Sequence, residues 1–319
     1  MFYCRKLISY QLKTRSTSVE IDLDQAGKIY TTGSDVTGQV VINASKQVNY
    51  DQIIVSLKGE GRVYPGKLVS YVRGPKCAGH HHGEVYCAKS TILLDNRNQL
   101  TRQTLPAGEH RFPFRFKLTG SRLPTSFKGS LGYISYFVGA KVVRSSFKND
   151  IVASVEIPFV ETVDINCDQL LKPVCIEDKK TVYSLRGASS PITLRVQLDH
   201  SGFCIGERIP IQADVQNGSG RNVTLQAKLV RKSQFGAADH QVDRTSEVLK
   251  TVSGPQVAPG DSFQWSSDSL VVPATEPTIT TSSYISVFYV LKVFVVIPQA
   301  RNCTITIPIT IGTVPLAGQ

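Results

Sequence analysis

Apolar and polar side chains alternate along most of this chain, and helical periodicity is almost absent. In residues 192–198, Ile, Leu, Val and Leu alternate with Thr, Arg and Gln. Successive side chains of a β-strand point to opposite faces, so such a segment forms a half-buried strand. The same alternation recurs at residues 112–118, 209–215, 223–229 and 305–311. The chain is therefore predicted to be all-β, with antiparallel sheets packed as immunoglobulin-like sandwiches.

The length of 319 residues favours two such sandwiches in tandem. Turn residues between short strands support a division near residues 161–175. We predict an N-terminal sandwich at 18–162, a connector at 163–175 and a C-terminal sandwich at 176–316.

Three strands have features that constrain their surroundings. Pro113 and Pro308 interrupt alternating segments, and because proline donates no ladder hydrogen bond, each strand is expected to be an edge at that point. Residues 284–296 are apolar on both faces, which predicts a strand that is buried twice.

Composition indicates a globular chain of the cytosol. Hydrophobic residues make up 41% and charged residues 19%, enough to build a core and too little charge for disorder. No run of about 18 apolar residues is present, and the N-terminal segment lacks the apolar core of a signal peptide. The seven cysteines are odd in number and irregularly spaced, which favours reduced thiols.

Positive charge is concentrated in the first half. Residues 1–165 contain 22 Lys and Arg against 13 Asp and Glu, a net charge of +9, and the remaining residues carry +2. Such a balance points either to a solubilising surface or to an acidic partner: a phosphorylated or acidic peptide, an anionic membrane surface, or nucleic acid. Scattered strand lysines account for the pattern without nucleic acid, so a nucleic-acid partner is not predicted. The candidate cations for acidic or phosphorylated cargo are Lys58, Arg62, Lys67, Arg73, Lys141 and Arg144.

The segment "KCAGHHHGEVYC", residues 76–87, is rich in metal-ligating side chains. Thiolate and imidazole groups could close a tetrahedral zinc site, and two histidines at alternate positions share one face of an extended backbone. The spacing matches no standard zinc finger, so a solvated loop is favoured and no metal or cofactor is predicted. The weak candidate ligands are Cys77, His80, His82 and Cys87.

No catalytic motif is present in the sequence. Asp199, His200 and Ser201 have the residue types of a triad, but adjacent residues cannot meet as nucleophile, base and orienting group. There is no phosphate-binding loop and no nucleophile elbow. The sequence does not predict an enzyme.

Several motifs in order resemble the arrestin-domain-containing proteins, or α-arrestins. The N-terminal half carries Leu-Pro-Ala-Gly-Glu-His and Phe-Pro-Phe within residues 105–114, followed by the strand 136–144. The C-terminal half carries "HSGFCIGERIPIQADVQNGS" at 200–219 and "IPITIGTVPL" at 307–316. Together with the strands at 35–42 and 53–64, the resemblance covers roughly residues 18–316, and it implies two arrestin-like sandwiches.

The resemblance implies a non-catalytic cytoplasmic adaptor that binds cytoplasmic regions of membrane cargo such as receptors and transporters. Such adaptors act in endocytosis, endosomal sorting and protein transport, at the plasma membrane and endosomes. Many members recruit WW-domain ubiquitin ligases through Pro-Pro-x-Tyr motifs in a C-terminal tail, but this sequence contains no Pro-Pro dipeptide. A structural coat subunit of the retromer type, which shares the double-sandwich shape, is the alternative.

Two departures from the family narrow the expected function. The stretch that matches the phosphate-sensing strand of visual and β-arrestins carries Glu20, Asp22 and Asp24, so this sensor is not expected here. Ser262 stands where thioredoxin-binding relatives have a cysteine, three residues before Trp265, so thioredoxin capture is not expected either.

Overall fold

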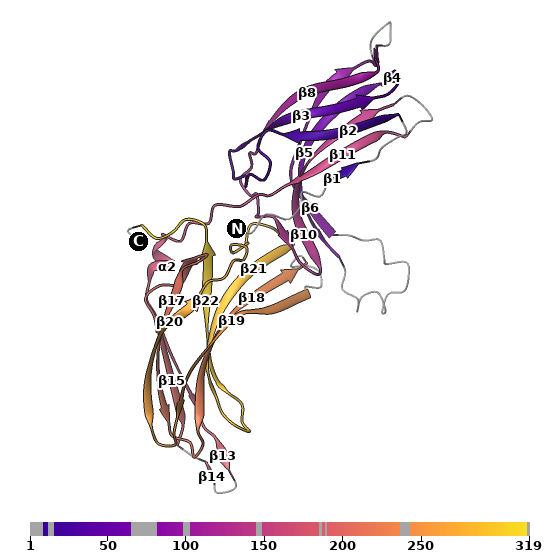
Figure 1. Ribbon diagram of the computed structural model, residues 1–319. Helices are drawn as coiled ribbons and strands as arrows, with labels where there is room; N and C mark the ends of the chain where they lie inside the picture. The colour runs from indigo at the N-terminus through magenta and orange to yellow at the C-terminus, as the bar shows by residue number, and fades with distance from the viewer. Residues whose placement is uncertain are drawn as a thin grey trace, which may run out of the picture. The chain divides into compact units, whose positions relative to one another are not determined.

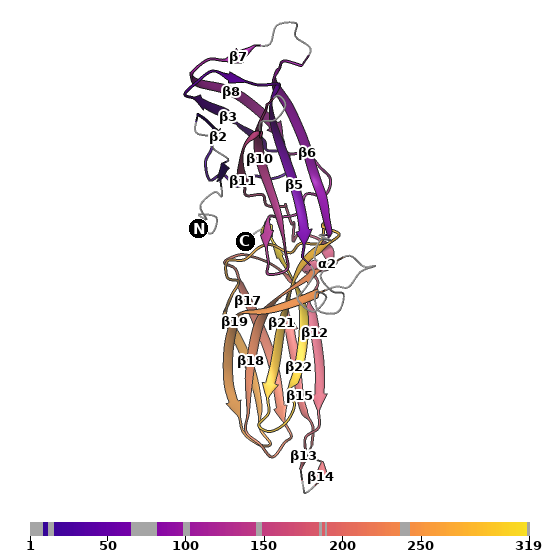
Figure 2. The same cartoon turned by 90° about the vertical axis from the view of Figure 1, so that its right-hand side faces the viewer.

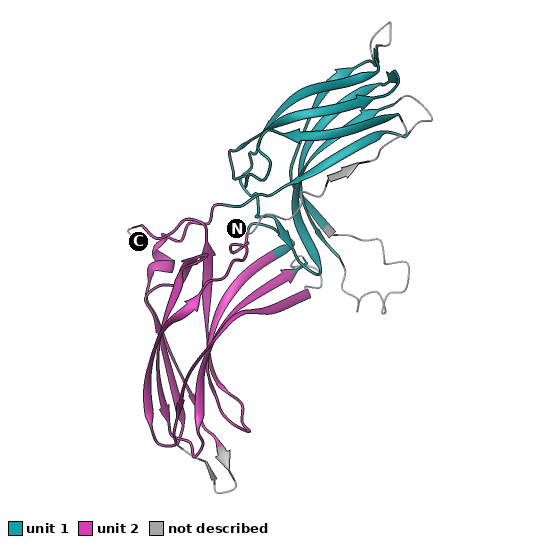
Figure 3. Cartoon of the chain, viewed as in Figure 1, with its two compact units in different colours: residues 1–161, 235–241, 281–285 teal, residues 162–234, 242–280, 286–319 magenta. Residues whose placement is uncertain are grey.

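The computed structural model describes residues 9–11, 16–64, 82–97, 103–144, 149–184, 187–188, 190–236 and 243–317. The chain divides into two compact units (Figure 3). Unit 1 comprises Met1–Glu161 together with two later segments, Phe235–Gln241 and Thr281–Ile285, and unit 2 contains the remainder.

Unit 1 is a β-sandwich of two main sheets (Figure 1). The larger sheet has the order β1-β11-β10-β5-β6, with β9 paired to β10, and the smaller has the order β2-β3-β8. A two-stranded ribbon joins β4 to β7. The bounds are β1 (Ser9–Gln11), β2 (Thr17–Leu23), β3 (Asp35–Ala44), β4 (Val48–Asn49), β5 (Gln52–Val63), β6 (His82–Asp95), β7 (Thr104–Leu105), β8 (Gly108–Lys117), β9 (Phe127–Lys128), β10 (Gly132–Val143) and β11 (Ile151–Ile157).

The core of unit 1 lies between the two sheets, seen from the side in Figure 2. Strand β10 places alternate residues inward, and Ile134, Tyr136, Val138 and Val142 are fully buried. The predicted alternation in β8 is also observed, because its Phe side chains point inward and its charged residues outward. The alternating sequence therefore forms this sandwich by burying one face of each sheet.

Unit 2 is a second sandwich, formed by the sheets β12-β15-β17-β20 and β16-β22-β21-β18-β19. A short helix, α2 (Asp168–Leu171), precedes it, and β13 and β14 form a small hairpin. The bounds are β12 (Val174–Lys180), β13 (Tyr183–Ser184), β14 (Gly187–Ala188), β15 (Ile192–Leu198), β16 (Gly202–Cys204), β17 (Arg208–Asn217), β18 (Val223–Phe235), β19 (Asp243–Val257), β20 (Ser262–Val271), β21 (Ile285–Val296) and β22 (Cys303–Gly312).

The proline predictions are confirmed. Pro113 lies on β8, the edge strand of its sheet. Pro308 pairs with Val290 of β21 on one side, while the neighbouring β16 pairs with β22 only from Thr310 onward. Both prolines therefore stand where no ladder hydrogen bond is required of them. The β16–β22 pair is parallel, which makes it an exception to the otherwise antiparallel main sheets.

Strand β21 is apolar on both faces, as its sequence indicates. The side chains on its inner face are completely buried at Leu291 and Val293. On its outer face Phe294 is only 8% exposed. In the part of the chain that the structure describes, no helix has the length and apolar character needed to cross a membrane.

Candidate functional site

The outer face of the large sheet in unit 1 collects several of the predicted cations. In the β5–β10 register, Lys58 lies opposite Phe137 and Arg62 lies opposite Tyr133. Directly opposed residues of an antiparallel pair share one face of the sheet. The neighbours of these residues along β10 are buried in the core, so this face points away from the core.

A carboxylate at the centre of this face binds both cations. Glu60 accepts hydrogen bonds from Lys58 Nζ at 2.7 Å and from Arg62 Nε at 3.0 Å. Arg62 Nη2 donates a second bond to Glu60, at 3.1 Å, and the Tyr133 hydroxyl donates to Glu60 Oε1 at 3.0 Å. The Glu60 side chain is only 8% exposed, whereas those of Lys58 and Arg62 are 36% and 43% exposed.

The pKa values in this network follow from its contacts. Burial raises the pKa of the Glu60 carboxyl, but the hydrogen bonds from Arg62, Lys58 and Tyr133 outweigh burial and hold the pKa below its usual value. Burial, together with the Glu60 carboxylate, raises the pKa of Tyr133 to about 12. At neutral pH the network is therefore an ionised carboxylate surrounded by donors.

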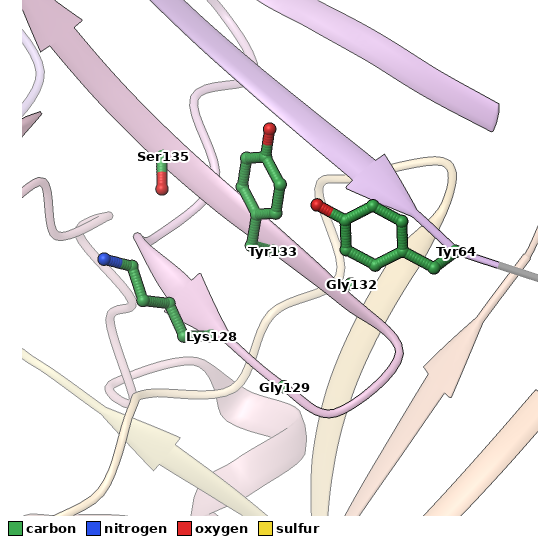
Figure 4. Close-up of a pocket in the computed structure, with 6 residues that line it drawn as sticks. All are labelled: Tyr64, Lys128, Gly129, Gly132, Tyr133 and Ser135. Atoms are coloured by element: carbon green, nitrogen blue, oxygen red, sulfur yellow. The ribbon is translucent and has the colours of Figure 1, made fainter. Parts of the chain in front are cut away.

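Two neighbouring hollows open on the same face, with volumes of about 360 Å³ and about 240 Å³. Both are lined by Tyr133 and Ser135 of β10, so the two hollows adjoin along this strand, and we call them together the depression. Figure 4 shows that Tyr64 and Lys128 stand on either side of β10 at the first hollow. The second hollow is lined additionally by Phe137, Ser154 and Glu156.

Charges around the depression are also paired. Lys128 Nζ lies 2.5 Å from Glu156 Oε2, and Ser135 Oγ donates to Glu156 Oε1 at 2.8 Å. The rings of Tyr64 and Tyr133 lie with their centroids 6.1 Å apart. The depression thus presents aromatic rings and hydroxyls, with cations that an incoming carboxylate or phosphate can reach only by competing with Glu60 or Glu156.

The four predicted cations that the structure describes lie in two separate places on the sheet. Lys141 Nζ pairs with Asp150 at 2.8 Å, and the Arg144 guanidinium donates to the Asn149 carbonyl. Lys141 lies four residues beyond Phe137 on β10, about 14 Å along the strand, so this pair of cations is separate from Lys58 and Arg62. Lys67 and Arg73 lie outside the described residues.

Of the four weak metal candidates, the structure describes only the side chain of Cys87. This thiol is 9% exposed and packs beside Gly59 and Tyr136 on β5 and β10. Burial raises the pKa of the Cys87 thiol, which disfavours the thiolate that a metal would need. Cys77, His80 and the His82 side chain lie outside the described residues. Within the described residues, no three His, Cys, Asp or Glu side chains are grouped closely enough to hold a metal ion.

The residues of this face that we did not predict include Glu60, Tyr64, Lys128, Tyr133 and Glu156. The alternation Lys58, Glu60, Arg62 is readable in the sequence and would have placed the carboxylate between the two cations. The pairing of Lys128 with Glu156 joins two segments that are 28 residues apart, and no local sequence pattern indicates it.

Comparison with known proteins agrees with the double-sandwich fold. The family model for the arrestin (or S-antigen) N-terminal domain matches residues 19–166, and the model for the arrestin C-terminal domain matches residues 188–316. The chain therefore belongs to the arrestin family, whose members are generally adaptors that carry out no reaction.

Within that family the chain is an α-arrestin. It is 30% identical to arrestin domain-containing protein 4 of Mus musculus over 309 residues, covering 92% of this chain and 71% of the relative. It is 26% identical to arrestin domain-containing protein 17 of Caenorhabditis elegans, covering 94% and 71%. It is 25% identical to thioredoxin-interacting protein of Homo sapiens, covering 93% and 74%.

Proposed function

We propose that this chain is an adaptor that binds cytoplasmic regions of membrane cargo, receptors and transporters among them, and directs the cargo into endocytosis and endosomal sorting. It acts without catalysis, in the cytoplasm, and is recruited to the plasma membrane and endosomes. Membership in the α-arrestins supports an adaptor role. Ubiquitin-ligase recruitment through WW domains belongs to the same proposal and requires a Pro-Pro-x-Tyr tail.

The observation that carries the proposal is the depression along β10. An extended peptide places alternate side chains on one side, about 7 Å apart, which is the spacing of alternate residues on the strand beneath it. Tyr133, Ser135 and Phe137 are such alternate residues, and all three line the depression. Aromatic rings with polar tips are frequent anchors of protein interfaces because they bury a large area and still form hydrogen bonds.

The charge pairs suit an acidic or phosphorylated cargo segment. A carboxylate or phosphate that enters the depression can replace Glu60 as the acceptor for Lys58 and Arg62. Because the replacement exchanges one ion pair for another, it contributes more to selectivity than to affinity. The partner-binding residues of the proposal are Lys58 and Arg62, with Lys67, Arg73, Lys141 and Arg144 as further candidates.

Proximity labelling in cells tests the proposal directly. The full-length chain is compared with the double variant Tyr133→Ala and Phe137→Ala, and with the matched control Phe263→Ala, which removes an exposed ring in unit 2. We expect the wild type and the control to label plasma-membrane transporters and receptors, and the double variant to lose most of this labelling. Equal labelling by all three proteins would contradict cargo binding at the depression.

The alternative is a structural coat subunit of the retromer type. A coat subunit would stay in a stable heteromeric complex during purification in high salt, whereas an adaptor of transient affinity would elute alone. Persistence of such a complex would favour the coat subunit.

A further inference from the structure

Three adjacent strands of unit 2 contain no carboxylates, and two of them carry cations. Strands β22, β21 and β18 follow one another in the five-stranded sheet, as Figure 1 shows. None of their sequences contains Asp or Glu, although they carry four cations. These are Lys228, Arg231, Lys232 and Lys292.

The register shows which side chains share the outer face of this sheet. Lys292 lies opposite Thr306, and Phe294 lies opposite Thr304, while both threonines are exposed. The intervening Val293 is completely buried in the core. We call this outer surface the lysine face, and it consists of Lys228, Lys232, Phe288, Val290, Lys292, Phe294, Thr304, Thr306 and Pro308.

Two of its lysines lie over aromatic rings. Lys228 Nζ is 5.1 Å from the centroid of the Phe294 ring, and Lys232 Nζ is 5.8 Å from that of Phe288. This geometry permits cation–π attraction, and it covers the rings with the aliphatic part of each lysine. The two ammonium groups are therefore held on one face, and none of the described carboxylates lies within ion-pair distance of them.

The charges here differ from those of unit 1. On the outer face of the unit 1 sheet, Lys58, Arg62, Lys128 and Lys141 each have a carboxylate within ion-pair distance. Arg231, which is not part of the lysine face, pairs with two glutamates, but no carboxylate of the described residues forms an ion pair with any of the three lysines. The uncompensated positive surface of the described chain thus includes this face, even though the second half of the sequence carries little net charge.

We propose that the lysine face binds an acidic, extended peptide segment of a partner protein. Lys228 and Lys232 are four residues apart on β18, about 13 Å, which is the separation of acidic residues four positions apart in an extended peptide. Thr304 and Thr306 supply hydroxyls along the same face. This site lies in unit 2 and is independent of the depression that carries the proposed cargo function.

The composition of the face favours a peptide over a membrane surface. Membrane docking combines lysines with apolar side chains that enter the lipid. Here Phe294 is only 8% exposed and Val290 only 5% exposed, and both phenylalanine rings are covered by lysines. The most accessible polar groups are therefore ammonium and hydroxyl groups, which match carboxylates, and only Pro308 and part of Phe288 add accessible apolar surface.

Fluorescence anisotropy of the full chain with a labelled peptide tests the proposal. The probe is a peptide in which Glu alternates with Ser, and the control probe has Gln in place of every Glu. The test variant is the triple substitution Lys228→Gln, Lys232→Gln and Lys292→Gln. A matched control removes three exposed cations elsewhere in unit 2, Lys172→Gln, Lys179→Gln and Arg301→Gln.

The wild type and the matched control are expected to bind the Glu peptide and not the Gln peptide. The triple variant is expected to bind at least about tenfold more weakly, because one exposed ion pair is worth up to about a fivefold change in affinity. The corresponding Lys→Arg triple variant keeps the charges and should keep the affinity, which separates loss of charge from loss of fold. Circular dichroism checks the fold of each variant.

Three outcomes would overturn the proposal: no binding of the Glu peptide by the wild type, unchanged affinity in the triple variant, or an equal loss in the matched control. A parallel measurement uses vesicles of phosphatidylcholine and phosphatidylserine. Binding to these vesicles through the three lysines, without binding to the peptide, would assign the face to a membrane and would also overturn the proposal.

Discussion

Replacing Glu60 by Gln should lower the stability of unit 1 by about 1–2 kcal/mol at neutral pH. The substitution keeps the shape and one acceptor oxygen but removes the charge that pairs with Lys58 and Arg62. Both partner side chains are more than a third exposed, so each ion pair is worth at most about 1 kcal/mol. The hydrogen bond from Tyr133 loses its charged acceptor, which adds up to about 1 kcal/mol.

The loss of stability in Glu60→Gln should decrease as the pH is lowered. The pKa of Glu60 in the folded chain lies below its ordinary value of 4.5. A carboxyl of this kind stabilises the folded state fully above its unfolded pKa, and the contribution declines as the pH falls through the folded pKa. The difference in the free energy of unfolding between the wild type and Glu60→Gln should therefore be constant from about pH 6 to about pH 8. It should shrink below about pH 4.5.

Urea unfolding followed by circular dichroism at several pH values measures this difference. The same variant should bind an acidic peptide at the β10 depression about threefold more tightly, because Lys58 and Arg62 lose their internal acceptor. Stability and binding would then change in opposite directions. If Glu60→Gln were as stable as the wild type at neutral pH, or if the difference persisted unchanged at low pH, the described network would not contribute as argued.

Three further substitutions test the packing. Tyr136→Phe leaves the Pro124 carbonyl without the hydroxyl that donates to it at 2.8 Å and should cost about 1–2 kcal/mol by urea unfolding; no change would mean that the carbonyl finds another donor. Asn217 is 1% exposed and donates to three backbone carbonyls, so Asn217→Ala should cost about 3 kcal/mol or more, and a loss below about 1 kcal/mol would contradict this role. A Cβ on Gly254 would lie 2.9 Å from the Trp265 ring, so Gly254→Ala should cost about 1–3 kcal/mol and alter tryptophan fluorescence, whereas an unchanged spectrum would show that the ring moves freely.

The alternating pattern was sufficient to predict several of the strands and the side chains that they bury. Phe114 and Phe116 point inward, and the exposed Lys141 lies opposite in face to Tyr136 and Val138, as their positions in the sequence indicate. Proline donates no backbone hydrogen bond, so Pro113 and Pro308 were predicted to lie where their strands are sheet edges, and both do. These features depend only on whether a residue occupies an odd or an even position along its strand, which can be read directly from the sequence.

The position of Cys87 could not be predicted in the same way. The β5–β6 register shifts between Gly59 and Glu60, so one residue of β6 is inserted between Val85 and Cys87. A bulge of this kind reverses the face of the side chains that follow it, as far as the second register shift between Ile53 and Ile54. Counting from the histidines along the segment therefore gave no reliable face for the cysteine, which the structure buries.

The candidate site was predicted only in part. Lys58 and Arg62 were selected for their charge, and their shared face follows from parity. The depression beside them depends on the pairing of β10 with β5 and β9, which brings Tyr64 and Lys128 to the same place from distant parts of the chain. Such long-range register is set by global packing, and local residue patterns do not contain it.

Unit 1 is assembled from segments that are far apart in the sequence, and this affects how the chain folds during synthesis. Its first 161 residues are completed by segments at 235–241 and 281–285, and the ring of Phe235 packs against that of Phe127 with centroids 6.1 Å apart. Synthesis runs from the N-terminus, so the first sandwich emerges from the ribosome long before these late pieces do. Nascent chains must therefore wait, with part of that sandwich still uncovered, until residue 285 has been translated.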